Sequence, residues 1–423
     1  MLQLSFTKRS TYFLLLLITI SGLLARFYFA WQLNHSLPDS PTRLVGDETG
    51  YDGLAEALFY GSFFQWPGRT PVYPLFLAAC YWAFGHSVAM AVYMQVFAGA
   101  IAIPLTYILS RRYTTVKVSL VAAAIVAFHP SLILQVTRLY TEVLYTPLLL
   151  LMLITLFKAL EKPVATRFGL AGAMLAITNL CRPTTMLFPG LMPFLMPFNW
   201  SIKKRISLFL VYVVVLILVT APWTYHNYKT YHAFLPYSVS TALLWQGSPE
   251  FYHLSKKNNL VTIWSEQLNS KKNGGHDPFS IEGDYYFTQR AIVSIKQEPG
   301  IYVKYFFQKL AYCWIGNKVN DWPGGRIFSI STMKKYYTNS AVFFIFFARL
   351  LPIFVFAGLF FIRKRIKDFI PLLLVCGYFT FLHALTYTEV RYSEPLYPII
   401  AILLACELEV IWRKIKPVNL SVS

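Results

Sequence analysis

Residues 11–31 read TYFLLLLITISGLLARFYFAW, an apolar run long enough to cross a hydrocarbon core of about 30 Å as a helix. Of the 423 residues, 56% are hydrophobic and only 13% are charged, a composition typical of a membrane protein rather than a soluble one. Comparable runs follow at 88–109, 116–132, 139–158, 168–181, 183–198, 206–222, 341–362, 369–387 and 395–412. The sequence therefore predicts an all-α polytopic membrane protein, a bundle of about ten transmembrane helices.

Two of these runs, 168–181 and 183–198, are short and are joined at Arg182-Pro183. They form either a hairpin of two spans or one broken element. A further apolar run, 71–84, is interpreted as a helix at the membrane interface, because counting it as a span would move Arg111-Arg112 to the outer side. The first external loop is therefore expected to contain interfacial helices.

The positive charge of the chain, a net +19, lies mainly at the ends of the apolar runs. This distribution follows the positive-inside rule and argues against nucleic-acid binding. Ten spans bring the basic clusters to one side, which we expect to be cytoplasmic together with both termini, as in a multi-pass protein of the plasma (inner) membrane. The clusters are Lys8-Arg9, Arg111-Arg112, Lys203-Lys204-Arg205, Arg363-Lys364-Arg365 and Arg413-Lys414.

This threading divides the chain into three parts. Residues 1–222 form an N-terminal transmembrane catalytic module with the external loop 32–87, 223–340 an external (periplasmic) loop region, and 341–423 the C-terminal helices with a short cytoplasmic tail. Apolar residues at helical spacing within 285–295 and 302–314 predict that the second external region is mainly helical.

The acidic pair Asp47-Glu48 directly follows the first span and opens a stretch with helical spacing of apolar residues, which Gly61 would end. One interpretation is structural: Asp47 caps the helix and Glu48 complements its dipole. The other is a functional site on the outer face. The charges of the other outer segments favour the second.

Those other charges are chiefly four arginines that depart from the positive-inside rule: Arg69, Arg138, Arg182 and Arg391. A guanidinium group offers a rigid fork that suits phosphate oxygens and stays ionised near lipid. Each arginine could instead extend toward the interface or pair with a nearby glutamate. Glu142 lies four residues after Arg138, so it is either the structural partner of that arginine or part of the site.

Several common chemistries have no sequence signature here. The chain has no glycine-rich phosphate loop, no His-Glu-x-x-His helix and no Gly-x-Ser-x-Gly elbow. Its five cysteines are scattered and lack metal-ligand spacing.

A series of short motifs, in order, resembles the GT-C superfamily of membrane glycosyltransferases, and is most similar to the branch of the protein O-mannosyltransferases and the lipid A aminoarabinose transferase. Each motif alone is weak, and their order carries the resemblance. The motifs are Asp47-Glu48-x-x-Tyr51, Arg69-Thr70-Pro71-Val72-Tyr73-Pro74, Thr141-Glu142, Cys181-Arg182-Pro183 and Glu389-Val390-Arg391-Tyr392.

This resemblance implies a GT-C-like bundle that transfers a sugar, with inversion, from a polyprenyl-phosphate carrier such as undecaprenyl phosphate. The acceptor would be a cell-envelope glycan, a glycolipid such as lipopolysaccharide, or a protein on the extracytoplasmic side. It assigns catalysis to Asp47 as general base, with Glu48 and Glu142. The resemblance assigns binding of the lipid phosphate to four arginines, Arg69, Arg391, Arg182 and Arg138. It assigns other substrate contacts to Tyr51, Tyr73 and Tyr392.

No cofactor is required by this resemblance, although Asp47, Glu48 and Glu142 together could supply oxygen ligands to a divalent cation. Two other functions remain open. A transporter or flippase for a polyprenyl-linked sugar would also place arginines near a lipid phosphate, but its acidic groups should lie deep within the helices. A non-catalytic scaffold of the cell envelope would tolerate the loss of Asp47.

Overall fold

The computed structural model describes residues 7–37, 39, 43–64, 66–240, 242–258, 263, 276–277, 279–315 and 339–415. Every regular element in these ranges is a helix, as the sequence predicts. Parts of the predicted external region, 259–262, 264–275 and 316–338, and most of the predicted tail lie outside the described residues.

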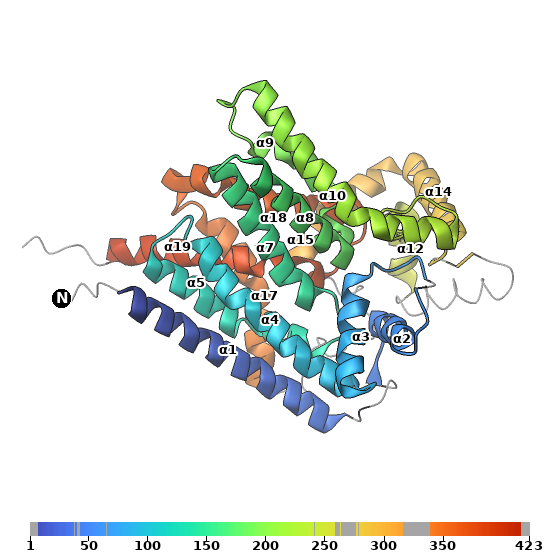
Figure 1. Cartoon of the computed structure of the whole chain (residues 1–423), viewed down its shortest axis with the longest axis horizontal. Helices are drawn as coiled ribbons and strands as arrows, with labels where there is room; N and C mark the ends of the chain where they lie inside the picture. The colour runs from blue at the N-terminus through green and yellow to red at the C-terminus, as the bar shows by residue number, and fades with distance from the viewer. Residues whose placement is uncertain are drawn as a thin grey trace, which may run out of the picture.

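Six described helical segments are long and apolar enough to cross a membrane. Figure 1 shows most of them running side by side along the long axis of the molecule. They comprise α1 (Lys8–Ser36), α4 (Val88–Ser110), α7 (Glu142–Glu161), α10 (Ile202–Tyr231), α18 (Ile366–Leu385) with the turn before it, and α19 (Tyr397–Ile415) with η8 (Val390–Leu396) before it. The protein is therefore a multi-pass membrane protein, and the count of ten spans stays a prediction.

A bent pair of helices is a seventh candidate span. Helix α5 (Val116–Phe128) is followed after His129 by α6 (Pro130–Leu134) and η2 (Gln135–Thr137), at an angle of 51°. Pro130 cannot donate a backbone hydrogen bond, so the helix is interrupted there. The buried guanidinium of Arg26 in α1 donates to the carbonyl oxygens of Val126 and Ala127, at 3.0 and 2.8 Å. A charge within the first span thus satisfies carbonyls that the break leaves free.

The run 183–198 is broken into short helical pieces rather than one continuous helix. Four prolines interrupt it, and each removes a backbone donor. The segment contains only η3 (Pro183–Thr185), η4 (Phe188–Leu191) and α9 (Met192–Leu195).

The predicted first external loop folds into two helices, α2 (Asp47–Phe59) and α3 (Val72–Phe84), which pack against each other beside one end of the bundle (Figure 1). Helix α2 stops just before Gly61, whose φ of +83° is in the region that favours glycine. The predicted helix boundaries in this loop are therefore confirmed.

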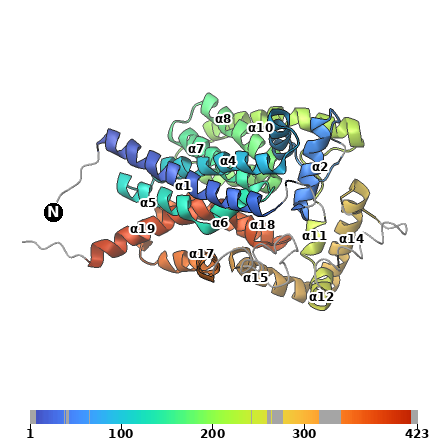
Figure 2. The same cartoon turned by 90° about the horizontal axis from the view of Figure 1, so that it is seen from below.

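The predicted second external region contributes α11 (Leu243–Gln246), α12 (Pro249–Lys257), α14 (Ile281–Gln297) and α15 (Pro299–Ile315). The first three lie at the same end of the molecule as α2 (Figure 2), and α15 packs against α18. The two predicted helices, 285–295 and 302–314, are confirmed. The buried ammonium group of Lys309 in α15 donates to the carbonyl oxygens of Gly247 and Thr386, at 3.0 and 2.7 Å. It ties this region to the chain that leads into η8.

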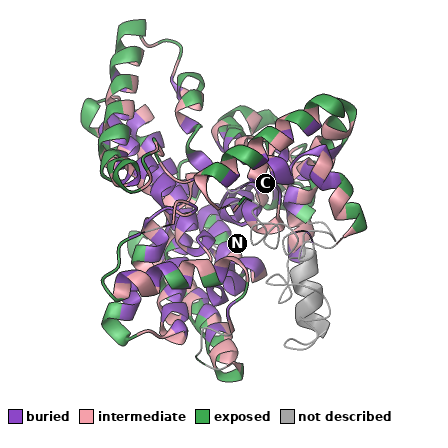
Figure 3. Ribbon diagram, turned by 90° about the vertical axis from the view of Figure 1, so that its right-hand side faces the viewer, coloured by how far each residue is buried: buried purple, intermediate pink, exposed green. Residues whose placement is uncertain are grey.

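Buried residues collect in the interior of the bundle, and exposed ones lie at its periphery (Figure 3). Helix α8 (Ala165–Cys181) packs closely against both α7 and α10. The approach to α10 depends on Gly172, because a Cβ there would overlap the backbone carbonyl of Tyr212. A small residue at this point lets the two backbones meet, as is common between membrane helices.

We expect Gly172→Ala to lower the free energy of unfolding by about 1–3 kcal/mol, since it forces α8 away from α10. The measurement is thermal unfolding of the purified protein in detergent. Gly377→Ala in α18 is the matched control, because a Cβ at Gly377 meets nothing within 4 Å. Equal melting temperatures for the two variants would contradict this account of the contact.

Candidate active site

Asp47 lies between two arginines from distant parts of the chain. Its Oδ1 accepts a hydrogen bond from Arg69 and its Oδ2 one from Arg391, each at 2.6 Å. The Asp47 side chain keeps 33% of its surface exposed. It is the first residue of α2, and Gly46 occupies the capping position, so the helix-cap interpretation of Asp47 is wrong.

The charges around this centre alternate in sign. The guanidinium of Arg391 also contacts Glu389 at 2.5 Å and lies 3.9 Å from Glu142. Glu142, at the start of α7, pairs with Arg182 and accepts a hydrogen bond from Thr141 at 3.0 Å. Three arginines and three carboxylates thus form one connected cluster. Glu389 is a member that the sequence offered only as a neighbour of Arg391.

Short contacts hold the arginines in place. The Thr70 hydroxyl donates to the carbonyl of Cys181 at 3.0 Å, which ties the segment bearing Arg69 to the end of α8, where Arg182 follows. Aromatic rings also support the guanidinium groups of Arg69 and Arg182. The Arg69 guanidinium lies 4.8 Å from the ring centre of Tyr51, and that of Arg182 lies 4.4 Å from the ring centre of Tyr392.

Glu48 and Arg138 form a separate, deeper pair. Arg138 Nε lies 3.1 Å from Glu48 Oε1, and the two side chains are only 3% and 5% exposed. Glu48 also accepts backbone N–H bonds from Leu139 at 3.0 Å and Val45 at 3.3 Å. This geometry suits a structural link between the first external loop and the segment before α7; the catalytic assignment of Glu48 and the phosphate assignment of Arg138 stay predictions.

Of the two alternatives for Glu142, the pairing with Arg138 is wrong, and the reason lies in where α7 begins. Helix α7 begins at Glu142, so Arg138 lies outside it and the helical i, i+4 geometry does not apply. Each of the two residues instead pairs with a more distant partner.

The three tyrosines differ in access. Tyr73 is fully buried, and its hydroxyl donates to Gln95 at 2.5 Å, which leaves it no surface for a substrate. Its ring packs edge to face against Tyr51 at 5.0 Å. Tyr51 and Tyr392 are the two that contact the arginines of the cluster. Tyr73 therefore supports the ring of Tyr51 through this buried contact.

The electrostatic environment separates the carboxylates. Burial opposes ionisation of Asp47, but Arg69 and Arg391 outweigh it and lower the pKa of Asp47 below its usual range. For Glu48 and Glu389 burial outweighs the neighbouring arginines and raises the pKa of each. With its arginines in contact, Asp47 is thus a stable anion and a weak base.

The predicted cation ligands Asp47, Glu48 and Glu142 do not fit a metal site. Both oxygens of Asp47 face guanidinium groups, and those of Glu48 face Arg138 and backbone N–H groups. Glu142 pairs with Arg182. Arginines already supply the positive charge that an ion would bring.

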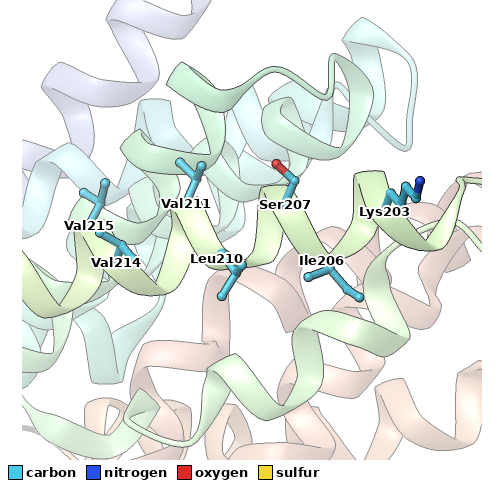
Figure 4. A pocket seen from close by; sticks show the side chains of 7 residues that line it. All are labelled: Lys203, Ile206, Ser207, Leu210, Val211, Val214 and Val215. Atoms are coloured by element: carbon cyan, nitrogen blue, oxygen red, sulfur yellow. The ribbon is translucent and has the colours of Figure 1, made fainter.

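A hollow elsewhere on the surface lies along α10, between Lys203 and Val215 (Figure 4). Aliphatic side chains line most of it, and Lys203 is its one charged residue. Without convergent polar groups it does not compete with the arginine cluster as a site.

Comparison with known proteins gives a family match over part of the chain and a likeness of fold to solved structures. Residues 68–226 match the family model described as dolichyl-phosphate-mannose-protein mannosyltransferase. An oligosaccharyltransferase from Archaeoglobus fulgidus, in complex with zinc and sulfate, has a TM-score of 0.54 and 14% identity over 95% of this chain and 49% of that one. The archaeal enzyme in complex with an inhibitory peptide and a dolichol-phosphate gives 0.55 and 14%, over 98% and 52%. The fold is that of these neighbours, and the family match over residues 68–226 agrees with the resemblance that the motifs carry.

The chain spans about half the length of the archaeal enzyme. ArnT from Cupriavidus metallidurans, bound to undecaprenyl phosphate, has a TM-score of 0.46 and 13% identity over 94% of this chain and 78% of that one. No curated protein matches the chain by sequence. The matched segment 68–226 contains Arg69, Glu142 and Arg182 of the cluster, together with Arg138 of the separate pair.

We predict that Arg138→Met lowers the free energy of unfolding by about 3–5 kcal/mol, because it leaves Glu48 buried without its cation. Thermal unfolding in detergent measures the loss. The double variant Arg138→Met/Glu48→Met should recover much of it. Arg413→Met, which removes a guanidinium with 71% exposure from the pair with Glu409, is the control and should change little. A similar small change in both single variants would refute the buried link.

Proposed function

We propose that this protein is a membrane glycosyltransferase that moves a sugar from a polyprenyl-phosphate carrier to an acceptor on the extracytoplasmic side. The observation that carries the proposal is Asp47, a partly exposed carboxylate held between Arg69 and Arg391. The GT-C fold and the family match support it. The mannosyltransferase family takes its sugar from dolichyl phosphate, as its description states.

The chemistry of the transfer fits the charges of the cluster. The acceptor hydroxyl loses its proton to Asp47, and its oxygen forms a bond to the anomeric carbon as the bond from that carbon to the phosphate oxygen breaks. The bonding electrons leave with the phosphate, which changes from a diester with one negative charge to a monoester with up to two. Arg69 and Arg391 lie where they would stabilise this increase. A single displacement of this kind inverts the anomeric carbon.

The same arginines would control the strength of the base. In the structure they hold Asp47 as a weak base. A phosphate that takes over hydrogen bonds from Arg69 and Arg391 would release the carboxylate and raise its basicity. Donor binding would therefore precede activation of the acceptor.

The orientation we propose places this cluster on the periplasmic or exterior face, with both termini in the cytoplasm. Contacts among the basic clusters support it. Arg365, before α18, donates to the carbonyl of Tyr113 after α4, so two of these clusters lie at one end of the bundle. Glu142 is the first residue of α7 and Arg182 directly follows the last residue of α8, so both lie at the end of the bundle away from these basic clusters. The positive-inside rule makes the first end cytoplasmic.

The transferred group that we propose is a hexosyl or pentosyl unit, and the acceptor is an envelope glycan, a glycolipid or a protein. Mass spectrometry of these three fractions, from cells with and without the gene, identifies both. A mass difference of one sugar in one fraction supports transfer. Accumulation of an unconsumed polyprenyl-linked sugar on the inner leaflet alone would indicate a flippase.

Asp47→Asn should reduce transfer by about 10²–10⁴-fold, the contribution of a positioned general base. The assay uses purified protein in liposomes with polyprenyl-phosphate sugars and the acceptor fraction identified above. Asp368→Asn is the control, since that carboxylate is half exposed and pairs with Arg365 before α18. Thermal unfolding verifies that each variant is folded. Undiminished transfer by folded Asp47→Asn protein would exclude Asp47 as the base.

Arg69→Ala should raise the KM for the donor by about 10–100-fold, because a hydrogen bond to a charged group contributes about 1.5–3 kcal/mol. Arg391→Ala should also lower kcat, since it contacts Glu389 and Glu142 as well as Asp47. Initial rates against donor concentration separate the two parameters. Arg413→Ala serves as a charge-matched control. If the donor KM is the same in all three variants, the phosphate assignment fails.

A further inference from the structure

Three potential metal ligands meet at the seam between α2 and the turn after α3, in a group separate from the arginine cluster. Asp52 and Glu56 are four residues apart on α2 and so share one face. His86 follows Gly85, whose φ of +76° turns the chain back after α3. One ligand atom from each residue lies within 4.8 Å of the other two.

The distances place the imidazole between the two carboxylates. His86 Nε2 lies 3.1 Å from Asp52 Oδ1, and His86 Nδ1 lies 3.5 Å from Glu56 Oε1. Glu56 is the most exposed of the three, with 42% of its side chain accessible. It is therefore free to turn its carboxylate toward an ion held by the other two.

Asp52 is a buried carboxylate without a permanent cation. Each of the other buried acidic groups in the first external loop and the site pairs with an arginine, as Glu48 and Glu142 do. Within the described part of the chain, Asp52 contacts no arginine or lysine, and its Oδ2 accepts no hydrogen bond. Its Oδ1 accepts one from Tyr81 at 2.5 Å. A buried carboxylate needs a compensating positive charge, and a neutral imidazole supplies none.

We propose that Asp52, Glu56 and His86 bind a divalent transition-metal ion of the zinc class. Imidazole nitrogen and carboxylate oxygen are ligands that zinc accepts, whereas calcium and magnesium prefer sites made of oxygen alone. Three protein ligands leave a fourth position for water.

The surroundings of the group are those of a supported metal site. The hydroxyl of Tyr81, which is fully buried, fixes the Asp52 carboxylate, and its ring lies edge to face on the His86 imidazole at 4.7 Å. Partners of this kind orient metal ligands and strengthen binding. The ion would link α2, which begins at Asp47, to the turn that ends α3. It takes no part in the transfer, so this inference stands apart from the proposed function.

The direct test measures metal binding by the full-length, tag-free protein in detergent after removal of metals with a chelator. Titration with Co²⁺, followed by its visible absorption and by metal analysis, should give one ion per chain, and excess Mg²⁺ should not displace it. His86→Ala should abolish binding. His253→Ala is the matched control and should retain it, because His253 contacts the single carboxylate of Glu298 at 3.0 Å.

Two further variants keep the test decisive if His86→Ala folds poorly. Glu56→Gln changes a half-exposed side chain and should weaken Co²⁺ binding while the protein stays folded. Tyr81→Phe should weaken binding by about 10–100-fold through the loss of its hydrogen bond to Asp52. Zn²⁺ should raise the melting temperature of the wild type and leave that of His86→Ala unchanged.

The proposal is overturned if the wild type binds no Co²⁺, or if Glu56→Gln and His86→Ala bind it as the wild type does. A wild-type melting temperature that does not respond to Zn²⁺ would likewise contradict the proposal.

Discussion

The two hydrogen bonds from Arg69 and Arg391 to Asp47 join three parts of the chain that hydropathy alone would leave independent. Asp47 begins α2, Arg69 precedes α3, and Arg391 lies in η8 before the last helix. In a partly buried setting none of these charges is stable without the others. The position of the external loop, the ends of α7 and α8, and the entry into α19 are therefore fixed relative to one another by charge as much as by packing.

Much of this arrangement could be predicted from the sequence. The apolar runs located most of the long helices, and the arginines that depart from the positive-inside rule pointed to the charged cluster. The choice of partners could not be predicted, because it depends on where helices begin. Arg138 pairs with Glu48 rather than Glu142 since α7 starts after it. Hydropathy likewise does not distinguish a continuous span from the broken segment at 183–198.

The proximity of Asp52, Glu56 and His86 could not be predicted from the sequence for a related reason. Asp52 and His86 are 34 residues apart and fit no metal-binding spacing. Only the packing of α2 on α3, with the turn at Gly85, brings them together. Tyr73 differs from Tyr51 in a way that its motif could not predict, because its side chain is fully buried; its assignment as a substrate contact stays a prediction.

The sequence distance between Asp47 and Arg391 also has a consequence for biogenesis. The two partners are 344 residues apart, so a ribosome that adds 5–20 residues per second makes the second roughly 20–70 s after the first. During that interval Asp47 can already pair with Arg69, but the cluster still lacks Arg391 and Glu389. The site is thus assembled only when the last helices have been inserted, and a nascent or truncated protein in the membrane has no complete centre with which to act on lipid-linked sugars prematurely.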